Sequence, residues 1–414
     1  MRSLGVCAIL LTLAAVAPPP AQRGPFEPLW ALGALVLLAV TLQDVLSRLR
    51  LPAVVGWILS GLVLGPSLFH VVEPLRVPLL ALCFSVAGLW AGLLVGLGVS
   101  WPKARRIWRL PLVIATSTLL TVGIVAGGIS VATDLPPVTI LVLAALASMW
   151  GPLMSTFWRG REGQVIGLFG IAFAFIVLSV VLGATALPGG IDWVLRLWVA
   201  LLLGAVAGES LWRLHVLDRK VSALLSLAAL TIVATLVARR FGLPCLPMGL
   251  GLGLGLAVRQ GSGRQLEHLL APARSMAILL FAGLLAASAP FGGLLWPVPR
   301  GLLEILVVQI VTLVLIRGVA PAVWYPLPPD AEFSRRSGWL LLPRGLIAGE
   351  LVLGAGAALP GILSAGDGAL LRAVVFADVF IFSMFFAAVA AAVPPPAPTP
   401  PAVTEKEVDP PGDS

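Results

Sequence analysis

The sequence predicts an all-α polytopic membrane protein with about thirteen transmembrane helices. Apolar residues make up 59% of the 414 residues and charged residues only 11%, whereas about a quarter of an ordinary soluble domain is charged. The mean hydropathy is +1.04, and apolar windows of about 20 residues recur from Pro28 to Val393. These windows lack the in-out alternation of a membrane barrel. Each must therefore be a helix, because only a helix satisfies its own backbone hydrogen bonds in hydrocarbon.

Each expected span is about long enough to cross the bilayer, with some tilt. Turns and charged loops separate the spans, for example the Pro188-Gly189-Gly190 turn. The expected spans are residues 28–47, 53–69, 75–100, 110–132, 138–157, 165–187, 193–212, 221–241, 247–258, 275–291, 301–324, 339–358 and 369–392.

The two ends of the chain differ from this membrane part. Residues 1–20 contain one early cation, an apolar stretch, Ala15-Val16-Ala17 and three prolines, which is typical either of a cleaved signal sequence or of an extra N-terminal helix. Residues 393–414 are proline-rich and mildly acidic, and so predict a disordered tail. The expected organisation is therefore 1–20, a transmembrane domain at 28–392, and the tail.

The positions of the cations predict the orientation of the chain. If the first span starts outside, the inner loops hold about 16 Lys and Arg residues and the outer loops about seven. We therefore expect the N-terminus outside and the C-terminus in the cytoplasm of a bacterial inner membrane. The cations lie singly or in small groups at helix ends, so they indicate a lipid bilayer as the partner and argue against nucleic acid.

No pattern in the sequence indicates an enzyme, a metal site or a cofactor. The cysteines are odd in number and scattered, and we interpret them as small packing residues. The histidines are isolated, and we interpret them as interfacial polar residues. The glycine run at 249–255 lacks the spacing of a nucleotide-binding loop and predicts close helix packing. The residues concerned are Cys7, Cys83, Cys245, His70, His215 and His268.

A more specific pattern covers residues 44–67. Arg48, Leu51 and Pro52 lead into an apolar span with glycines four apart, and the span ends in Leu64-Gly65-Pro66. This string resembles the opening of the monovalent cation:proton antiporters, the sodium/proton and potassium/proton exchangers. Glycines at this spacing let helices approach closely.

The resemblance runs from about residue 38 to 386. Gly242-Leu243-Pro244 and the glycine-rich span after it look like the second-half counterpart of the opening hairpin, and Pro343-Arg344-Gly345 with Gly349-Glu350 is similar to signatures of the penultimate helix. The resemblance implies an inverted-repeat antiporter fold with two crossing broken helices. It also implies a monovalent cation and a proton as transported partners, a homodimer, and movement of a core bundle against a scaffold.

The broken helices are expected where glycine and proline interrupt two spans at corresponding places. The first interruption contains Ser148, Gly151 and Pro152, and the second contains Pro343 and Gly345. Half-helix ends at such breaks face the ion in transporters of this architecture. The alternative is that these residues only kink packed helices, which is common in membranes.

The chain departs from the family at the ion site. The antiporters usually carry an Asp or Thr-Asp in the first broken helix and an adjacent Asp-Asp or Asn-Asp in the next, but Met149-Trp150 and Phe175-Ile176 stand at those places. No ionisable residue occurs between Val165 and Leu187. A dry, aromatic crossing around Phe173 and Phe175 would argue strongly against ion exchange.

Four ionisable residues remain deep in the expected spans: Arg317, Arg344, Glu350 and Asp378. Burying each costs a few kcal/mol on insertion scales, and two cations with two carboxylates form a neutral set. We expect Glu350 and Asp378 to provide the carboxylates of an ion or proton pathway, with Arg317 and Arg344 compensating them and Ser148 at a backbone end. The alternative is a set of structural ion pairs that hold helices in register.

The leading hypothesis is a secondary active transporter with a degenerate cation:proton site. One alternative is a non-transporting membrane homologue that acts as a partner subunit or sensor, which the empty Phe175-Ile176 position favours. The other is a transporter of a different, anionic solute, because Arg317 and Arg344 persist where the usual acids are lost.

Overall fold

In the computed structural model, the described part of the chain is helical, with no strand among the described residues. The structure describes residues 27–49, 51, 53–66, 68–73, 77–98, 110–148, 171–181, 188–213, 220–257, 262–289, 302–315, 348–350, 352–353, 370–379 and 381. The expected N-terminal segment 1–20 and tail 393–414 lie outside these ranges.

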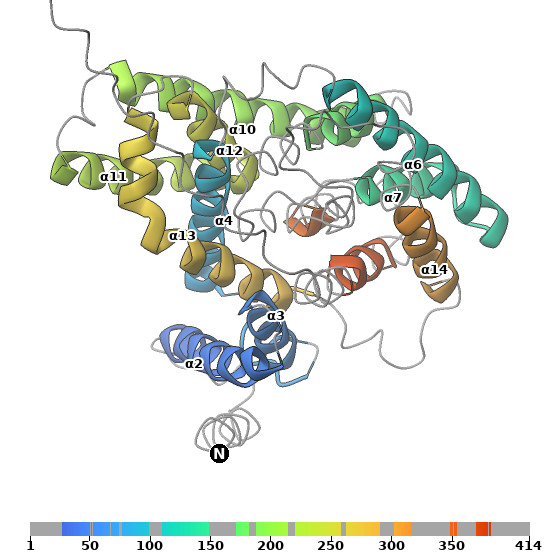
Figure 1. The fold of residues 1–414 in the computed structure, drawn as a ribbon, viewed down its shortest axis with the longest axis horizontal. Helices are drawn as coiled ribbons and strands as arrows, with labels where there is room; N and C mark the ends of the chain where they lie inside the picture. The colour runs from blue at the N-terminus through green and yellow to red at the C-terminus, as the bar shows by residue number, and fades with distance from the viewer. Residues whose placement is uncertain are drawn as a thin grey trace, which may run out of the picture.

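Ten helices have assigned bounds (Figure 1). Shorter helical stretches occur at 171–181, 348–350, 352–353 and 370–379. The ten helices are α2 Glu27–Arg48, α3 Ala53–Leu64, α4 Pro78–Leu97, α6 Leu110–Ala132, α7 Pro137–Ala147, α10 Pro188–Arg213, α11 Lys220–Phe241, α12 Cys245–Ala257, α13 Ser262–Ala287 and α14 Leu302–Leu313.

The chain is an integral membrane protein. Three described stretches, Pro28–Arg48, Pro78–Leu97 and Asp192–Leu211, are long and apolar enough to cross a membrane by length and composition. Large apolar side chains on α10 and α11 face outward, for example Val206 at 64% exposure and Leu225 at 67%. Such outward apolar faces would be an aggregation liability in water, and they suit contact with lipid.

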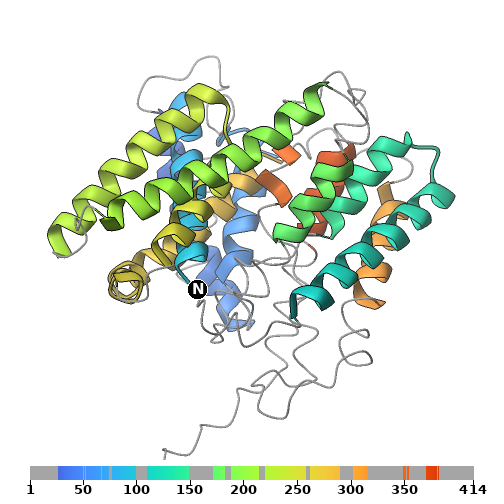
Figure 2. The same ribbon diagram turned by 90° about the horizontal axis from the view of Figure 1, so that it is seen from above.

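The helices form two groups. In both views α6, α7 and α14 lie together on one side, and α2, α3, α4, α11, α12 and α13 lie on the other (Figures 1 and 2). The short orange stretches at 348–350 and 352–353 lie between the two groups, and the red helix at 370–379 lies close to the group of α6, α7 and α14 (Figures 1 and 2). Helix α6 packs on α7 and α14, and α13 packs on α3 and α4.

Helices α4 and α12 of the second group form a stack with α10, which packs on α12; we call these three helices the glycine stack. Gly249 and Gly253 of α12 lie against the Leu89 and Leu93 carbonyls of α4, so close that a Cβ on either glycine would overlap them. Glycines two apart point to nearly opposite sides of a helix. Gly251 and Gly255 accordingly lie against the Leu201 and Ala205 carbonyls of α10. The close packing expected from the 249–255 run is therefore confirmed on both faces of α12.

The partner helices return these contacts with glycines of their own. Gly92 and Gly96 of α4 lie against backbone of α12, and so do Gly204 and Gly208 of α10. Between α3 and α13, Gly61 and Gly65 approach Gly283, Ala286 and Ala287 in the same way. Small residues at four-residue spacing thus remove the side chains that would hold these helices apart.

The helices that open the two hairpins, α2 and α11, end in the same kind of backbone hydrogen bond. After α2, the Leu51 N–H donates to the Leu46 carbonyl over 3.0 Å, and after α11, the Leu243 N–H donates to the Ala238 carbonyl over 2.7 Å. Each bond spans five residues, as in the Schellman motif, and in each hairpin a Leu-Pro pair then precedes the next helix. This agreement supports the expected relation between the two halves.

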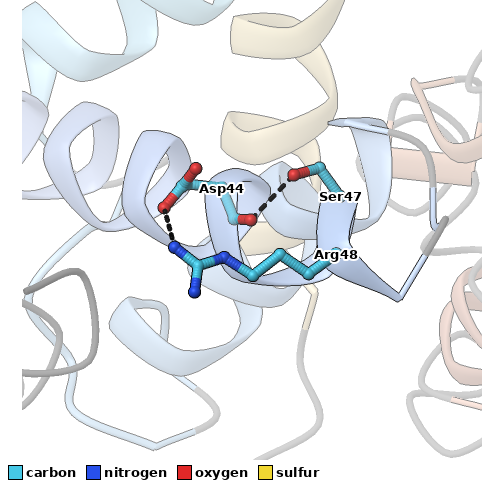
Figure 3. Close-up of polar contacts among 3 residues, drawn as sticks. All are labelled: Asp44, Ser47 and Arg48. Carbon is cyan, nitrogen blue, oxygen red and sulfur yellow. Dashed lines mark hydrogen bonds and ion pairs between the residues drawn. The ribbon is translucent and has the colours of Figure 1, made fainter. Parts of the chain in front are cut away.

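The polar contacts before the first hairpin are local (Figure 3). Arg48 pairs with Asp44 at 3.5 Å, and the Ser47 hydroxyl donates to the Asp44 carbonyl over 2.7 Å. Both charged side chains are more than half exposed, so this pair adds little to stability.

Several element bounds differ from the expected spans. Helix α3 ends at Leu64 rather than at residue 69, because Pro66 disfavours helical backbone in the residue before it. Helix α10 starts at Pro188, where a turn was expected, and α12 starts at Cys245, since proline fits the first turn of a helix. Helix α13 starts at Ser262 rather than at 275, because a helix can extend past its apolar part.

Candidate functional site around Glu350

Three of the expected site residues fall within the described ranges. Ser148, Glu350 and Asp378 are buried, at 0%, 8% and 0% exposure. Ala147, Ala348 and Val374, which are near them in sequence, belong to one apolar core cluster. The elements that carry the three residues therefore converge on the same core. The other expected residues lie outside the described ranges: Arg317, Arg344, Gly151, Pro152, Pro343 and Gly345.

Glu350 reaches the N-terminus of α12. Its Oε1 accepts the Leu246 N–H over 3.3 Å, and the Cys245 N–H also donates to this carboxylate. The first N–H groups of a helix have no partner within the helix. A carboxylate satisfies them and is favoured by the positive end of the helix dipole. Glu350 is thus bound by the free backbone N–H groups in the first turn of α12.

The surroundings of Glu350 come from α4, α12 and α13. Gly88 of α4 leaves room beside the carboxylate, because a Cβ there would stand 3.8 Å from Glu350 Oε1 and 3.0 Å from the Phe281 ring of α13. Phe281 stacks on Phe84 with ring centroids 5.3 Å apart. The second carboxylate oxygen, Oε2, is buried without a hydrogen-bond partner among the described residues.

The Cys245 thiol interacts electrostatically with the carboxylate and leads on to a second polar group. The Cys245 thiol is hydrogen-bonded with the Ser85 side chain, and Ser85 Oγ donates to the Ala81 carbonyl over 2.8 Å. The sequence predicts a packing role for Cys245 and gives no signal for Ser85 or Gly88. The one usable signal was Pro244 directly before Cys245, which marks a helix start.

Ser148 closes the end of α7. Its N–H donates to the Ala144 and Ala145 carbonyls, each over 3.1 Å, and its hydroxyl donates to the Ala145 carbonyl over 2.7 Å. Helix α7 therefore ends at the residue where the first break was expected to begin. The remainder of that break, from residue 149, lies outside the described ranges.

Asp378 lies on the last described helix. It is completely buried, and Val374, Val375, Phe376 and Val379 around it in sequence belong to the main core cluster. An acid at such a position is costly unless it has a role or a partner.

The helix at 171–181 makes an aromatic contact with α10. Phe175 is buried at 3% exposure, and its ring meets Trp198 edge-on with centroids 6.5 Å apart. The Trp198 indole N–H donates to Ser179 Oγ over 3.1 Å, whereas Ile176 points outward at 45% exposure. The surroundings of Phe175 are aromatic and apolar, so the described part of this helix offers no carboxylate for exchange.

The chain resembles solved structures of a sodium proton antiporter, MjNhaP1 from Methanocaldococcus jannaschii. One such structure has a TM-score of 0.61 at 15% identity, covering 88% of this chain and 97% of that one. A second, from electron microscopy, has a TM-score of 0.64 at 14% identity, covering 89% and 96%. No family model and no curated protein matches the chain. The likeness over nearly the full length of both chains shows that this membrane protein has the fold of a sodium proton antiporter.

Proposed function

We propose that this chain is a secondary active transporter that exchanges a monovalent cation for protons. The carrying observation is Glu350, a buried carboxylate between the two helix groups in a chain with an antiporter fold. An ionisable residue within a membrane span marks an ion or proton pathway by default, because its burial is costly. A transporter, rather than an enzyme, is the function that the fold supports.

The proposed pathway uses the residues expected from the sequence. Glu350 and Asp378 provide the carboxylates, Ser148 provides a polar group at the end of α7, and Arg317 and Arg344 compensate the negative charge. The broken-helix elements at Gly151, Pro152, Pro343 and Gly345 supply half-helix ends that face the pathway. Because Phe175 of the helix at 171–181 packs on Trp198 and that helix carries no acid, the proposal assigns the exchange to the carboxylates of other helices.

Flux measurements on proteoliposomes test the proposal. The purified protein should move sodium, potassium or lithium against an imposed pH gradient, and Glu350→Gln should reduce that flux at least tenfold. Glu304→Gln is the matched control, because Glu304 is an exposed acid in the first turn of α14. Flux that survives Glu350→Gln removes Glu350 from the pathway, and the absence of any pH-dependent cation flux rejects the proposal.

A second candidate is a non-transporting homologue that serves as a partner subunit or sensor. The Phe175–Trp198 contact favours it, because the helix that carries acids in the exchangers here only packs on α10. The same liposomes separate the two candidates. A homologue of this kind moves no solute of either charge, and a partner subunit co-purifies with it.

The membrane placement is part of the proposal. We place the chain in a bacterial inner membrane with the N-terminus outside and the C-terminus in the cytoplasm, because the cations are biased towards the inner loops. The homodimer is proposed from the resemblance to the antiporters alone.

A further inference from the structure

The contact between Glu350 and the N-terminus of α12 favours the negatively charged form of the carboxylate. The N-terminus of a helix is its positive end and favours a negative charge. Pro247, the third residue of α12, has no N–H, so Cys245 and Leu246 supply the first two donors, and both point to Glu350. A metal cation at this carboxylate would stand beside the same two donors and the same positive end.

The described surroundings also offer few ligands for a metal cation. Hard cations are held by several oxygen atoms, from carboxylates, carbonyls and waters. Among the described residues next to Glu350, Ser85 brings one hydroxyl, Cys245 brings a sulfur, and Gly88 and Phe281 bring none. A proton needs only one acceptor, and Glu350 Oε2 is a buried acceptor without a described hydrogen-bond partner.

We propose that Glu350 carries the proton of the exchange and never the metal cation, and that binding the proton loosens the residues around Glu350 from α12. This inference rests on the proposed function and assigns one of its two substrates to one carboxylate. The proton adds to Oε2 and the carboxylate becomes a neutral acid, with no other bond made or broken. The charge-assisted bonds from Leu246 and Cys245 then become ordinary ones, which are about half as strong.

This switch lies where the two helix groups meet. Glu350 lies on a segment between the groups (Figures 1 and 2), whereas its donors belong to the glycine stack. Among the described residues, the Cys245 thiol interacts electrostatically with Glu350, and the same thiol interacts with Arg239 of α11. Protonation therefore changes how firmly the segment of Glu350 is held to the glycine stack.

Infrared difference spectroscopy on the full chain in lipid tests the proton assignment. Acidification should produce a protonated-carboxyl carbonyl band that Glu350→Gln removes and Asp378→Asn leaves in place. Adding sodium, potassium or lithium at constant pH should leave the band unchanged. A band that is missing, or that falls on addition of any of these cations, overturns the assignment whatever the flux. A normal band in protein without flux rejects the proposed function and leaves the assignment standing.

Labelling of Cys245 tests the loosening. In a Cys7→Ser, Cys83→Ser background at one fixed pH, the neutral Glu350→Gln variant should expose Cys245 to a membrane-permeant maleimide about tenfold faster than the parent, as loss of a charge-assisted bond implies. Glu350→Asp keeps the charge and should stay close to the parent. Equal labelling in all three proteins overturns the coupling of protonation to movement.

Discussion

Single glycines determine how closely the three helices of the glycine stack approach. At Gly249 a Cβ would overlap the Leu89 carbonyl of α4, and backbone cannot move aside as a flexible side chain can. Exposed glycines such as Gly123 of α6 have nothing within 4 Å of the same position. Identical chemical changes at these two residues should therefore have opposite effects.

We expect Gly249→Ala to lower the free energy of unfolding by about 1–3 kcal/mol, the usual cost of overpacking. The matched control Gly123→Ala should be neutral or should stabilise by up to about 1 kcal/mol, because alanine favours helix. Thermal unfolding in detergent, followed by tryptophan fluorescence, measures both. Equal midpoints for the two variants would show that α4 and α12 are not in backbone contact.

The sequence identified Glu350 but not its partner. A carboxylate in an apolar span indicates that some partner exists. The partners that can be recognised in a sequence are side chains of opposite charge, here the arginines. The donors on α12 are backbone N–H groups, which every residue except proline carries, so no residue type indicates them. Ser85 and Gly88 were equally hidden, because their relevance depends on the packing of α4 against α12 and α13.

At the scale of the element, the hairpin between α11 and α12 sets the position of the Glu350 donors. Gly242 has φ +64°, a left-handed conformation that costs other residues roughly 1–2 kcal/mol. The Leu243 bond that follows it fixes where α12 starts.

Gly242→Ala should therefore destabilise the protein by about 1–2 kcal/mol, whereas Gly33→Ala, at an exposed helical position with nothing within 4 Å, should not. The clash with Arg196 Nη1 at 2.6 Å adds little, because the end of that side chain can move. Chemical denaturation of the two variants provides the comparison, and an unchanged midpoint for Gly242→Ala would contradict the left-handed turn.

Helix existence was more predictable than helix ends. The expected span 110–132 has the bounds of α6, since apolar sequence and helix coincide there. For α13, residues 262–274 carry Arg264, Glu267 and Arg274, so hydropathy excludes them from a span. Pro272 also predicts a break there, although α13 continues through it. The contact between Phe175 and Trp198 joins two separate helices, so the sequence around either residue does not predict it.

At the scale of the whole molecule, the thirteen spans expected within residues 28–392 would place the start of the first span and the C-terminal tail on opposite sides of the membrane. The loop cations predict which side is which. A fluorescent protein fused after Ser414 should fluoresce and alkaline phosphatase fused there should be inactive, because the former matures in the cytoplasm and the latter outside it. The reverse pattern at this end would invert the proposed orientation.

The glycine stack also constrains how the protein is made. Helices α4, α10 and α12 are far apart in the chain, so α4 enters the membrane long before α12 has been translated. The described part of helix α12 has 13 residues, about 20 Å at 1.5 Å per residue, against roughly 30 Å of hydrocarbon. A segment this short and glycine-rich has little affinity of its own for lipid. We therefore expect α12 to insert only after α4 and α10 are in the bilayer with their glycine faces accessible. Assembly of the glycine stack would then be completed late, when α12 has been translated.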